Sequence, residues 1–435
     1  MYQVSSASVL LRRDRGLAAR RRRSAPLANR TVVLLGLTSL FTDISSEMVV
    51  AVLPLYLVYV GGFSPLAFGL IDGLYQGATA FVGLASGYIG DRWRRHKAVA
   101  ATGYGVSAVC KLLLATVGTG IGAIGAIVLA DRTGKGIRTA PRDAMISLST
   151  SADRLGTAFG VHRALDTAGA MLGPIVAFGL LALAPLAFES IFVVSFCFAL
   201  VGLGILVLLV DPRRAREDTA DESRQAREDT ADEPAPRPSL RSALALLRVR
   251  RFRALLLVGG GLSLATASDA FVLLALEEKI DLGTTLFPLL FVGSAGAYML
   301  LAVPIGVVAD RVGRGRVLLA GYGLLLAVYV ALLLPLGGWP LVAAALGLLG
   351  GYYAATDGVL MALGSALVPD EVRGSGLALL RSVTSGARLV ASVAFGALWT
   401  FWGIEFALAC FGVALAVATV LAAIVLVRTR EPARA

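Results

Sequence analysis

Acidic and basic residues inside long apolar segments are the part of this sequence with the clearest chemical meaning. Asp43 and Glu47 lie one helical turn apart in the apolar segment 31–60, and Asp43 lies about 18 Å along a helix that starts at Thr31. An ionisable residue at such a depth in a membrane helix costs about 2.5–3.5 kcal/mol on insertion, so its default interpretation is functional. Two later segments carry charges at comparable depth: Arg132, Arg163 and Asp166.

These residues suit the binding and release of protons. A carboxylate in a low-dielectric site is stabilised by a nearby cation, and protonation removes its charge. We therefore take Asp43, Glu47 and Asp166 as candidates for proton coupling, with Arg132 and Arg163 as charge partners or substrate ligands. The alternative is a permanently paired set of charges that holds the first half of the chain together.

The second half of the chain has fewer such residues. Asp357 follows the pair Tyr352-Tyr353 in a polar stretch of an otherwise apolar segment, and this aromatic pair either lines a substrate cavity or packs in the interior. The asymmetry predicts that coupling resides in the first half and that the second half shapes the pocket. The candidates for a substrate site or charge network in the second half are Asp269, Tyr353, Asp357 and Arg381.

The segments that must position these residues are membrane helices. The chain has 435 residues, of which 57% are hydrophobic, and its mean hydropathy is +0.78. Soluble domains contain about 45–50% apolar residues, and a bilayer core needs about 20 apolar residues per helix. We predict an all-α integral membrane protein with twelve transmembrane helices. The apolar segments span 31–60, 66–90, 97–118, 121–146, 156–183, 188–210, 253–279, 284–309, 315–336, 340–367, 374–400 and 404–427.

The distribution of basic residues predicts the orientation. The formal net charge is +11, but the basic residues lie mostly outside the apolar segments, which disfavours a nucleic-acid-binding protein. Lysine and arginine mark cytoplasmic loops, so we expect a multi-pass protein of the inner (plasma) membrane with both termini in the cytoplasm. The predicted parts are a basic tail (1–30), a six-helix bundle (31–210), a disordered cytoplasmic linker (211–250), a second six-helix bundle (251–428) and a cytoplasmic tail (429–435).

Other classes of chemistry have little support in the sequence. The three cysteines form no CxxC pair, and two histidines do not suggest a metal site. No nucleophile–base pair has useful spacing, so we expect neither an enzyme nor a cofactor. The expected partners are a small-molecule substrate, protons and membrane lipids, and we expect a monomer.

A repeated turn carries a resemblance to a known family. The pattern Gly-x-x-x-Asp-Arg, followed by further basic residues, ends the second apolar segment and returns at the end of the eighth. Two six-helix halves with matching turns resemble the major facilitator superfamily, which implies alternating access around a central site. The resemblance implies a conformational latch, in which Arg95 pairs with Asp143 and Asp91 lies near 374–376. Arg94 departs from the family glycine. The implied latch residues are Gly87, Asp91, Arg92, Arg95, Asp143, Gly306, Asp310, Arg311, Gly313 and Arg314.

The segment 156–183 is similar to the fifth helix of proton-coupled drug antiporters of this superfamily. Gly160, Gly169, Gly173 and Pro174 fall at the spacing of the antiporter motif, although its closing glycine pair is absent. The alternative is ordinary close packing of helices at small residues. By this resemblance we expect multidrug-type efflux, that is, proton-coupled export of a small amphipathic or organic solute. The alternatives are uptake or uniport of a small, anionic metabolite, and a non-transporting receptor or scaffold.

Overall fold

The structure, a computed structural model, describes residues 29–78, 96–150, 154–211, 246–368 and 373–428. These residues are almost entirely helical and include no β-strand. Ten of the described helical segments are long and apolar enough to cross a membrane. The predicted all-α membrane fold is therefore confirmed.

The first half of the chain forms α2 and the helices that follow it to residue 211. The helix at 65–78 is described only to residue 78, and α5 carries too many charges to be counted among the ten apolar spans. The helices are α2 (Arg30–Leu55) with the π-helical η1 (Tyr56–Val60), the helix at 65–78, α4 (His96–Thr116), α5 (Ile121–Leu148), α6 (Leu155–Leu183), and α7 (Phe188–Gly204) with the π-helical η3 (Ile205–Leu209).

The second half begins with a short 3-10 helix and repeats the pattern of long helices. Glycines with positive φ form several of its turns, such as Gly313 (φ 105°) between α12 and α13, because only glycine adopts this conformation without strain. The elements are η4 (Leu246–Arg248), α10 (Arg250–Leu264), α11 (Asp269–Ile280), α12 (Phe287–Val312), α13 (Arg314–Leu333), α14 (Gly338–Leu367), α15 (Arg373–Trp402) and α16 (Ile404–Arg428).

The predicted segment at 253–279 lies within one stretch that is long and apolar enough to span a membrane, Arg250–Ile280, but its helix is divided into α10 and α11. The chain leaves the helix between α10 and α11, where the Thr266 hydroxyl donates to the Leu262 carbonyl oxygen at 2.8 Å. The Ala267 N–H donates to the Tyr329 hydroxyl oxygen at 2.8 Å, so α13 supplies an acceptor for a freed backbone group. A broken membrane helix is tolerated where neighbouring helices satisfy such groups.

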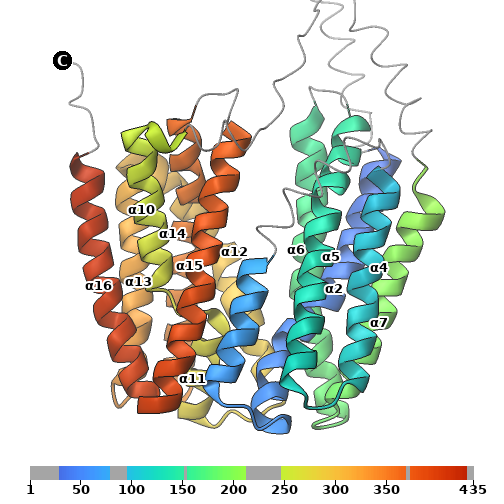
Figure 1. Ribbon diagram of the computed structural model, residues 1–435, viewed down its shortest axis with the longest axis horizontal. Helices are drawn as coiled ribbons and strands as arrows, with labels where there is room; N and C mark the ends of the chain where they lie inside the picture. Colours follow the sequence, from blue (N-terminus) through green and yellow to red (C-terminus); the bar gives the residue numbers. More distant parts are fainter. Residues whose placement is uncertain (1–28, 79–95, 151–153, 212–245, 369–372, 429–435) are drawn as a thin grey trace, which may run out of the picture.

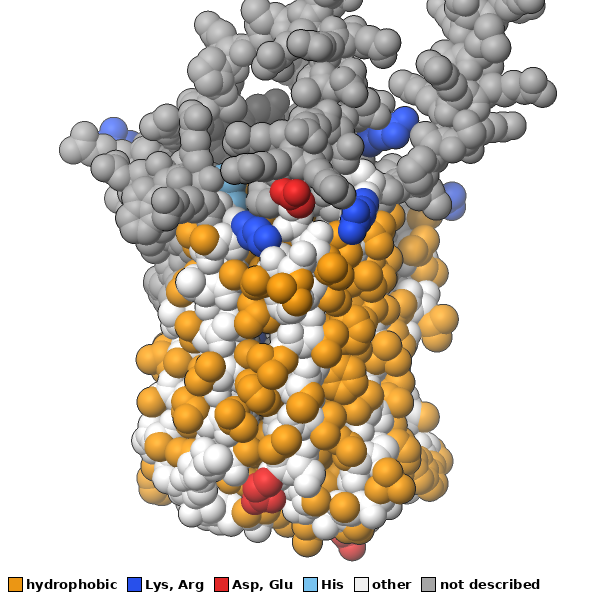
Figure 2. Space-filling view, turned by 90° about the vertical axis from the view of Figure 1, so that its right-hand side faces the viewer, with side chains coloured by type: hydrophobic (Ala, Val, Ile, Leu, Met, Phe, Trp, Pro, Cys, Tyr) orange, Lys and Arg blue, Asp and Glu red, His pale blue; other side chains and the backbone are white. Residues whose placement is uncertain are grey.

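The helices form two bundles that lie side by side (Figure 1). α2 packs on α6 and α7, α4 packs on α5 and α7, and α10 to α16 pack mainly on one another. Across the two bundles, α12 contacts α6 and α2, and α11 contacts α2. Hydrophobic side chains spread over the lateral face of the first bundle, and the charged side chains on this face lie near its two ends (Figure 2). Leu208 of this bundle is 80% exposed. Such an apolar lateral surface suits contact with lipid.

The two bundles meet at the end opposite to that where α2 begins and α16 ends (Figure 1). Phe68 of the first bundle packs on Phe271 with ring centroids 4.8 Å apart. Gly69 faces α15 so closely that a Cβ atom there would lie 2.6 Å from the Ser392 carbonyl oxygen. Tyr59 also donates a hydrogen bond of 2.7 Å to Glu277. These contacts close the space between the bundles at this end.

The predicted domain limits stay predictions. The tail at 429–435, nearly all of the tail at 1–30 and most of the linker at 211–250 lie outside the described residues.

Candidate functional site

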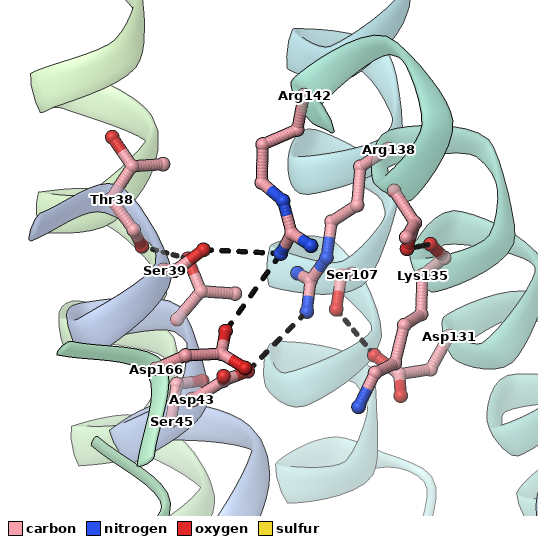
Figure 3. A network of polar contacts seen from close by, with 12 residues as sticks. Thr38, Ser39, Asp43, Ser45, Ser107, Asp131, Lys135, Arg138, Arg142 and Asp166 are labelled. Carbon is pink, nitrogen blue, oxygen red and sulfur yellow. Dashed lines mark hydrogen bonds and ion pairs between the residues drawn. The ribbon is translucent and has the colours of Figure 1, made fainter. Parts of the chain in front are cut away.

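A row of basic side chains runs along one face of α5. Lys135, Arg138 and Arg142 follow Asp131 at intervals of three and four residues, which places them on one side of a helix. They face Asp43 of α2 and Asp166 of α6 (Figure 3). At 1.5 Å per residue the row spans about 16 Å of helix. We call these residues, with Glu47, Lys111 and Arg132, the charge ladder.

The ion pairs at the end of the ladder nearest Leu148 are loose. Arg138 and Asp43 approach to 3.8 Å between Nη2 and Oδ1, and Arg142 and Asp166 to 3.8 Å between Nη1 and Oδ1. Both distances exceed that of a hydrogen bond. Arg142 instead donates to the Ser39 hydroxyl at 3.2 Å, and the Arg138 guanidinium lies 4.6 Å from the centre of the Tyr104 ring. The two acids are therefore held by charge and remain able to exchange partners.

The other end of the ladder is a tight, buried cluster around Asp131. This carboxylate accepts hydrogen bonds from the Lys111 ammonium, the Ser107 hydroxyl and the Arg132 guanidinium. The Arg132 guanidinium also lies over the Tyr75 ring, 3.9 Å from its centre. Arg132 thus pairs with its neighbour in sequence and not with Asp43. The cluster has the geometry of a structural ion pair, in which both carboxylate oxygens are occupied.

Between the two ends lie Glu47 and Lys135. Their charges interact, yet neither makes an ion pair within 4.0 Å among the described residues. A Cβ atom at Gly173 would lie 2.8 Å from the Glu47 Cβ, so α6 approaches α2 at this level because of that glycine. Glu47 is therefore held in place by packing, and its carboxyl group has no ion-pair partner within 4.0 Å among the described residues.

The antiporter-like motif of α6 divides into packing and open positions. Gly169 contacts the backbone of Leu40, and Gly173 contacts α2 beside Glu47. Pro174 is buried inside α6, whereas a Cβ atom at Gly160 would meet nothing within 4 Å. Two of the four motif residues thus serve the contact between α2 and α6.

Three predicted charged residues are exposed well inside their helices. Arg163 has a side chain 70% exposed and lies 3.8 Å from Asp166, and Asp357 and Arg381 are exposed in the second bundle. They lie about 12–15 Å from the nearer helix end at 1.5 Å per residue. Charged side chains at this depth face water or protein and not lipid. Their exposure favours a water-filled space on the side where α2 begins.

The second bundle holds a further polar group near the break between α10 and α11. Asp269 accepts a hydrogen bond from Tyr353, so two predicted candidates lie together. Tyr352 lies beside Tyr353 with ring centroids 4.9 Å apart, and Arg388 interacts electrostatically with Asp269.

Sequence reasoning missed three charged residues of these groups. Asp72 of the helix at 65–78 is 8% exposed and accepts a hydrogen bond from Ser392, across the two bundles. Lys111 completes the Asp131 cluster, and Arg142 binds Asp166. Asp72 is the single charge in the apolar segment 66–90, and Lys111 is the single charge in the interior of the segment 97–118, so the rule that selected Asp43 would also have selected them.

The predicted latch is described only in part. Gly87, Asp91, Arg92 and Arg95 lie outside the described residues, and so do the side chains at 374–375. The implied contacts of Asp91 and Arg95 therefore stay predictions. Asp143 has a partner in Arg142, with Nη2 and Oδ1 2.9 Å apart.

The second copy of this turn is described. Arg311 lies in the last turn of α12, Gly313 ends that helix, and a Cβ atom at Gly306 would meet nothing within 4 Å. Arg314 and Asp310 form an exposed ion pair of 3.3 Å. Such an exposed pair contributes at most about 1 kcal/mol.

Two bundles of membrane helices with buried charges have the architecture of a secondary transporter. The model of the Major Facilitator Superfamily matches residues 35–295 and 261–435 of this sequence. The chain belongs to this family and is a multi-pass membrane transporter of the major facilitator type.

Relatives and solved structures agree with this assignment. An uncharacterised MFS-type transporter of Methanocaldococcus jannaschii is 30% identical over 382 residues, covering 85% of this chain and 89% of that protein. An uncharacterised protein of Mycobacterium tuberculosis is 34% identical over 161 residues, covering 37% of this chain and 39% of that protein.

Among solved structures, a mutant of the nucleoside transporter NupG has a TM-score of 0.71 at 16% identity, covering 92% of this chain and 100% of that chain. A mutant of the peptide transporter POT in complex with sulfate has a TM-score of 0.72 at 14% identity, covering 93% of this chain and 96% of that chain. At these identities the likeness concerns the fold alone.

Proposed function

We propose that this transporter exports a small amphipathic or organic solute in exchange for protons, as the antiporter-like motif of α6 suggests. The observation that carries the proposal is the loose half of the charge ladder. Asp43 and Asp166 lie 3.8 Å from their cations, and Glu47 has no ion pair within 4.0 Å among the described residues. Three acids at membrane depth therefore have charges that a proton or a substrate can neutralise.

In this proposal, protonation changes which conformation is stable. Loss of the Asp43 charge would release Arg138, and loss of the Asp166 charge would release Arg142, so that α5 would no longer be held toward α2 and α6. A bare carboxylate in low dielectric is unfavourable, and protonation removes that cost. The two bundles would then rock around the central site, with the contacts at Tyr59 and Gly69 opening on one side.

We further propose the orientation and assembly. Both termini would lie in the cytoplasm of a cell whose inner membrane the protein spans, because the basic residues gather on that side. The space between the bundles would then face the cytoplasm in this conformation. We propose a monomer as the working unit.

The test uses purified protein in liposomes with a pH gradient. A substrate is first found by its effect on the thermal unfolding of the protein, and its uphill transport and its exchange are then measured. Asp43→Asn and Glu47→Gln should abolish uphill transport while leaving exchange, because exchange needs no net proton movement. Arg316→Gln, at the surface of α13, is the matched control for a changed charge. Normal uphill transport by both acid variants would refute the assignment.

A second function is favoured by the basic side of the ladder. Arg163 is exposed beside Asp166, and α5 presents three cations on one face, which suits uptake or uniport of an anionic metabolite. Flux in inverted vesicles distinguishes the two functions. Export in exchange for protons gives uphill accumulation inside inverted vesicles when the lumen is acidified, whereas a uniporter only equilibrates its substrate.

A further inference from the structure

A small cavity lies beside the Asp131 cluster, inside the first bundle. Its volume is 20 Å³, and its walls come from α2, the helix at 65–78, α4 and α5. A single water molecule needs about 10–15 Å³ of such volume. The cavity therefore has room for one small ion or one water molecule, but not for an organic solute.

The cavity is polar on one side and apolar on the other. Lys111, Asp131 and Arg132 line the polar side. The apolar walls consist of aliphatic side chains that offer no hydrogen bonds: Val49, Val50, Leu53, Leu114 and Val128. An occupant of this site would be largely stripped of its water and would have to be stabilised by the polar side.

Ser46 supplies an unused hydrogen-bond donor to this cavity. The residue is 1% exposed, and its hydroxyl oxygen has no hydrogen-bond partner among the described residues. Buried polar groups in folded proteins are nearly always hydrogen-bonded, so such an exception calls for an explanation. A bound group in the cavity would be the missing partner.

The side chains that line the cavity carry one positive charge in excess, because Lys111 and Arg132 are cations and Asp131 is the one acid among the lining residues. Lys135 lies outside this lining and shares its charge with Asp43 and Glu47. Both oxygens of Asp131 already accept hydrogen bonds from the two nearer cations. An uncompensated charge in a low-dielectric site is unfavourable, so the site calls for an anion.

We propose that this cavity binds a monovalent inorganic anion of halide size. The donors would be the Ser46 hydroxyl, the Lys111 ammonium and the Arg132 guanidinium. Lys111 has three N–H donors, and its acceptors among the described residues are Ser107 and Asp131, which leaves one donor for the anion. The small volume excludes sulfate and organic anions, and the single excess charge selects a monovalent ion. This site is separate from the acids proposed to couple protons, and binding at it does not depend on transport.

The test measures halide binding to the full chain in lipid nanodiscs, at constant ionic strength. Thermal unfolding is followed in sodium chloride, sodium bromide, sodium sulfate and sodium gluconate, and chloride binding is followed by the line width of chloride NMR. Chloride and bromide should raise the unfolding midpoint saturably, whereas sulfate and gluconate should not. Absence of a halide effect, or an equal effect of sulfate, would overturn the proposal and leave water as the occupant.

Two variants locate the site. Ser46→Ala should weaken the affinity for chloride at least about tenfold, because a hydrogen bond to a charged group is lost. Val50→Leu should also weaken it, by filling the cavity without changing any charge. The control is Ser294→Ala, whose hydroxyl donates within its own helix to Phe291 at 3.1 Å and should leave chloride binding unchanged. Chloride affinity equal to that of the unaltered chain in both Ser46→Ala and Val50→Leu would place the anion elsewhere and refute the site.

Discussion

The buried cluster around Asp131 allows the effect of one substitution to be worked out from its contacts. Asp131→Asn keeps the shape of the side chain but removes the only acid that touches both Lys111 and Arg132 among the described residues. The side chains of the two cations are 2% and 4% exposed, so water cannot replace the lost charge. Removing one partner of a buried pair costs about 3–5 kcal/mol. We expect a loss of stability in this range in a halide-free buffer.

A matched control comes from the exposed pair in the second bundle. Asp310 has a side chain 70% exposed and pairs with Arg314 at 3.3 Å. Asp310→Asn removes the same charge by the same chemical change, and an exposed pair contributes at most about 1 kcal/mol. Unfolding in mixed micelles, with sodium dodecyl sulfate as the denaturant, measures the free energy of unfolding of both variants. A similar loss for Asp131→Asn and Asp310→Asn would refute the reasoning.

A double variant tests the cause of the loss. Adding Lys111→Met to Asp131→Asn removes one of the two uncompensated cations, while Arg132 keeps its contact with the Tyr75 ring. The double variant should therefore be more stable than the sum of the single changes, with a coupling energy of about 0.5–3 kcal/mol. Additive effects would mean that the charges of Lys111 and Asp131 do not stabilise each other.

Three further predictions follow from the arrangement of the bundles. Gly69→Ala should destabilise the closed end, because the added Cβ would lie 2.6 Å from a carbonyl oxygen of α15. The distance between spin labels across that end should therefore increase. Gly122→Ala is the control, because a Cβ at Gly122 would meet nothing within 4 Å. Single cysteines at Ser64 and Arg227 of a cysteine-free variant should be labelled from outside and from inside the cell respectively, and the reverse pattern would invert the proposed topology. Asp91→Asn should keep the protein folded but shift it toward the inward-open form. Unchanged spin-label distances between the cytoplasmic ends of the segments 66–90 and 374–400, together with unchanged transport, would argue against a latch.

Helix positions could be predicted from the sequence because each needs a long apolar segment between turn residues. The predicted segment at 404–427 agrees with α16, which spans Ile404–Arg428. The break after Leu264 could not be predicted, because its backbone is satisfied by Tyr329, a residue distant in sequence. The pattern of apolar residues around the break carries no information about a hydrogen-bond partner that lies in another helix.

The membership of the candidate site was predictable, but its pairing was not. Asp43, Glu47 and Asp166 stand out as acids in apolar segments, and the structure places Asp43 and Asp166 beside Arg138 and Arg142 of α5. The partner of each acid depends on helix rotation and on the rotamers of long arginine side chains. Arg132 turns to its neighbour Asp131, while Arg138 reaches Asp43. Spacing in the sequence does not determine these choices.

The divided helix also has a consequence for biosynthesis. α10 has 15 residues and α11 has 12, so at 1.5 Å per residue they are about 22 and 18 Å long, and neither spans a hydrocarbon core of about 30 Å alone. The insertion machinery must therefore receive residues 250–280 as one continuous segment. The acceptor for the Ala267 N–H belongs to α13, which leaves the ribosome later. An exposed backbone donor in lipid costs several kcal/mol, so the break forms only after α13 has joined the bundle, and maturation of this span is completed by a helix made after it.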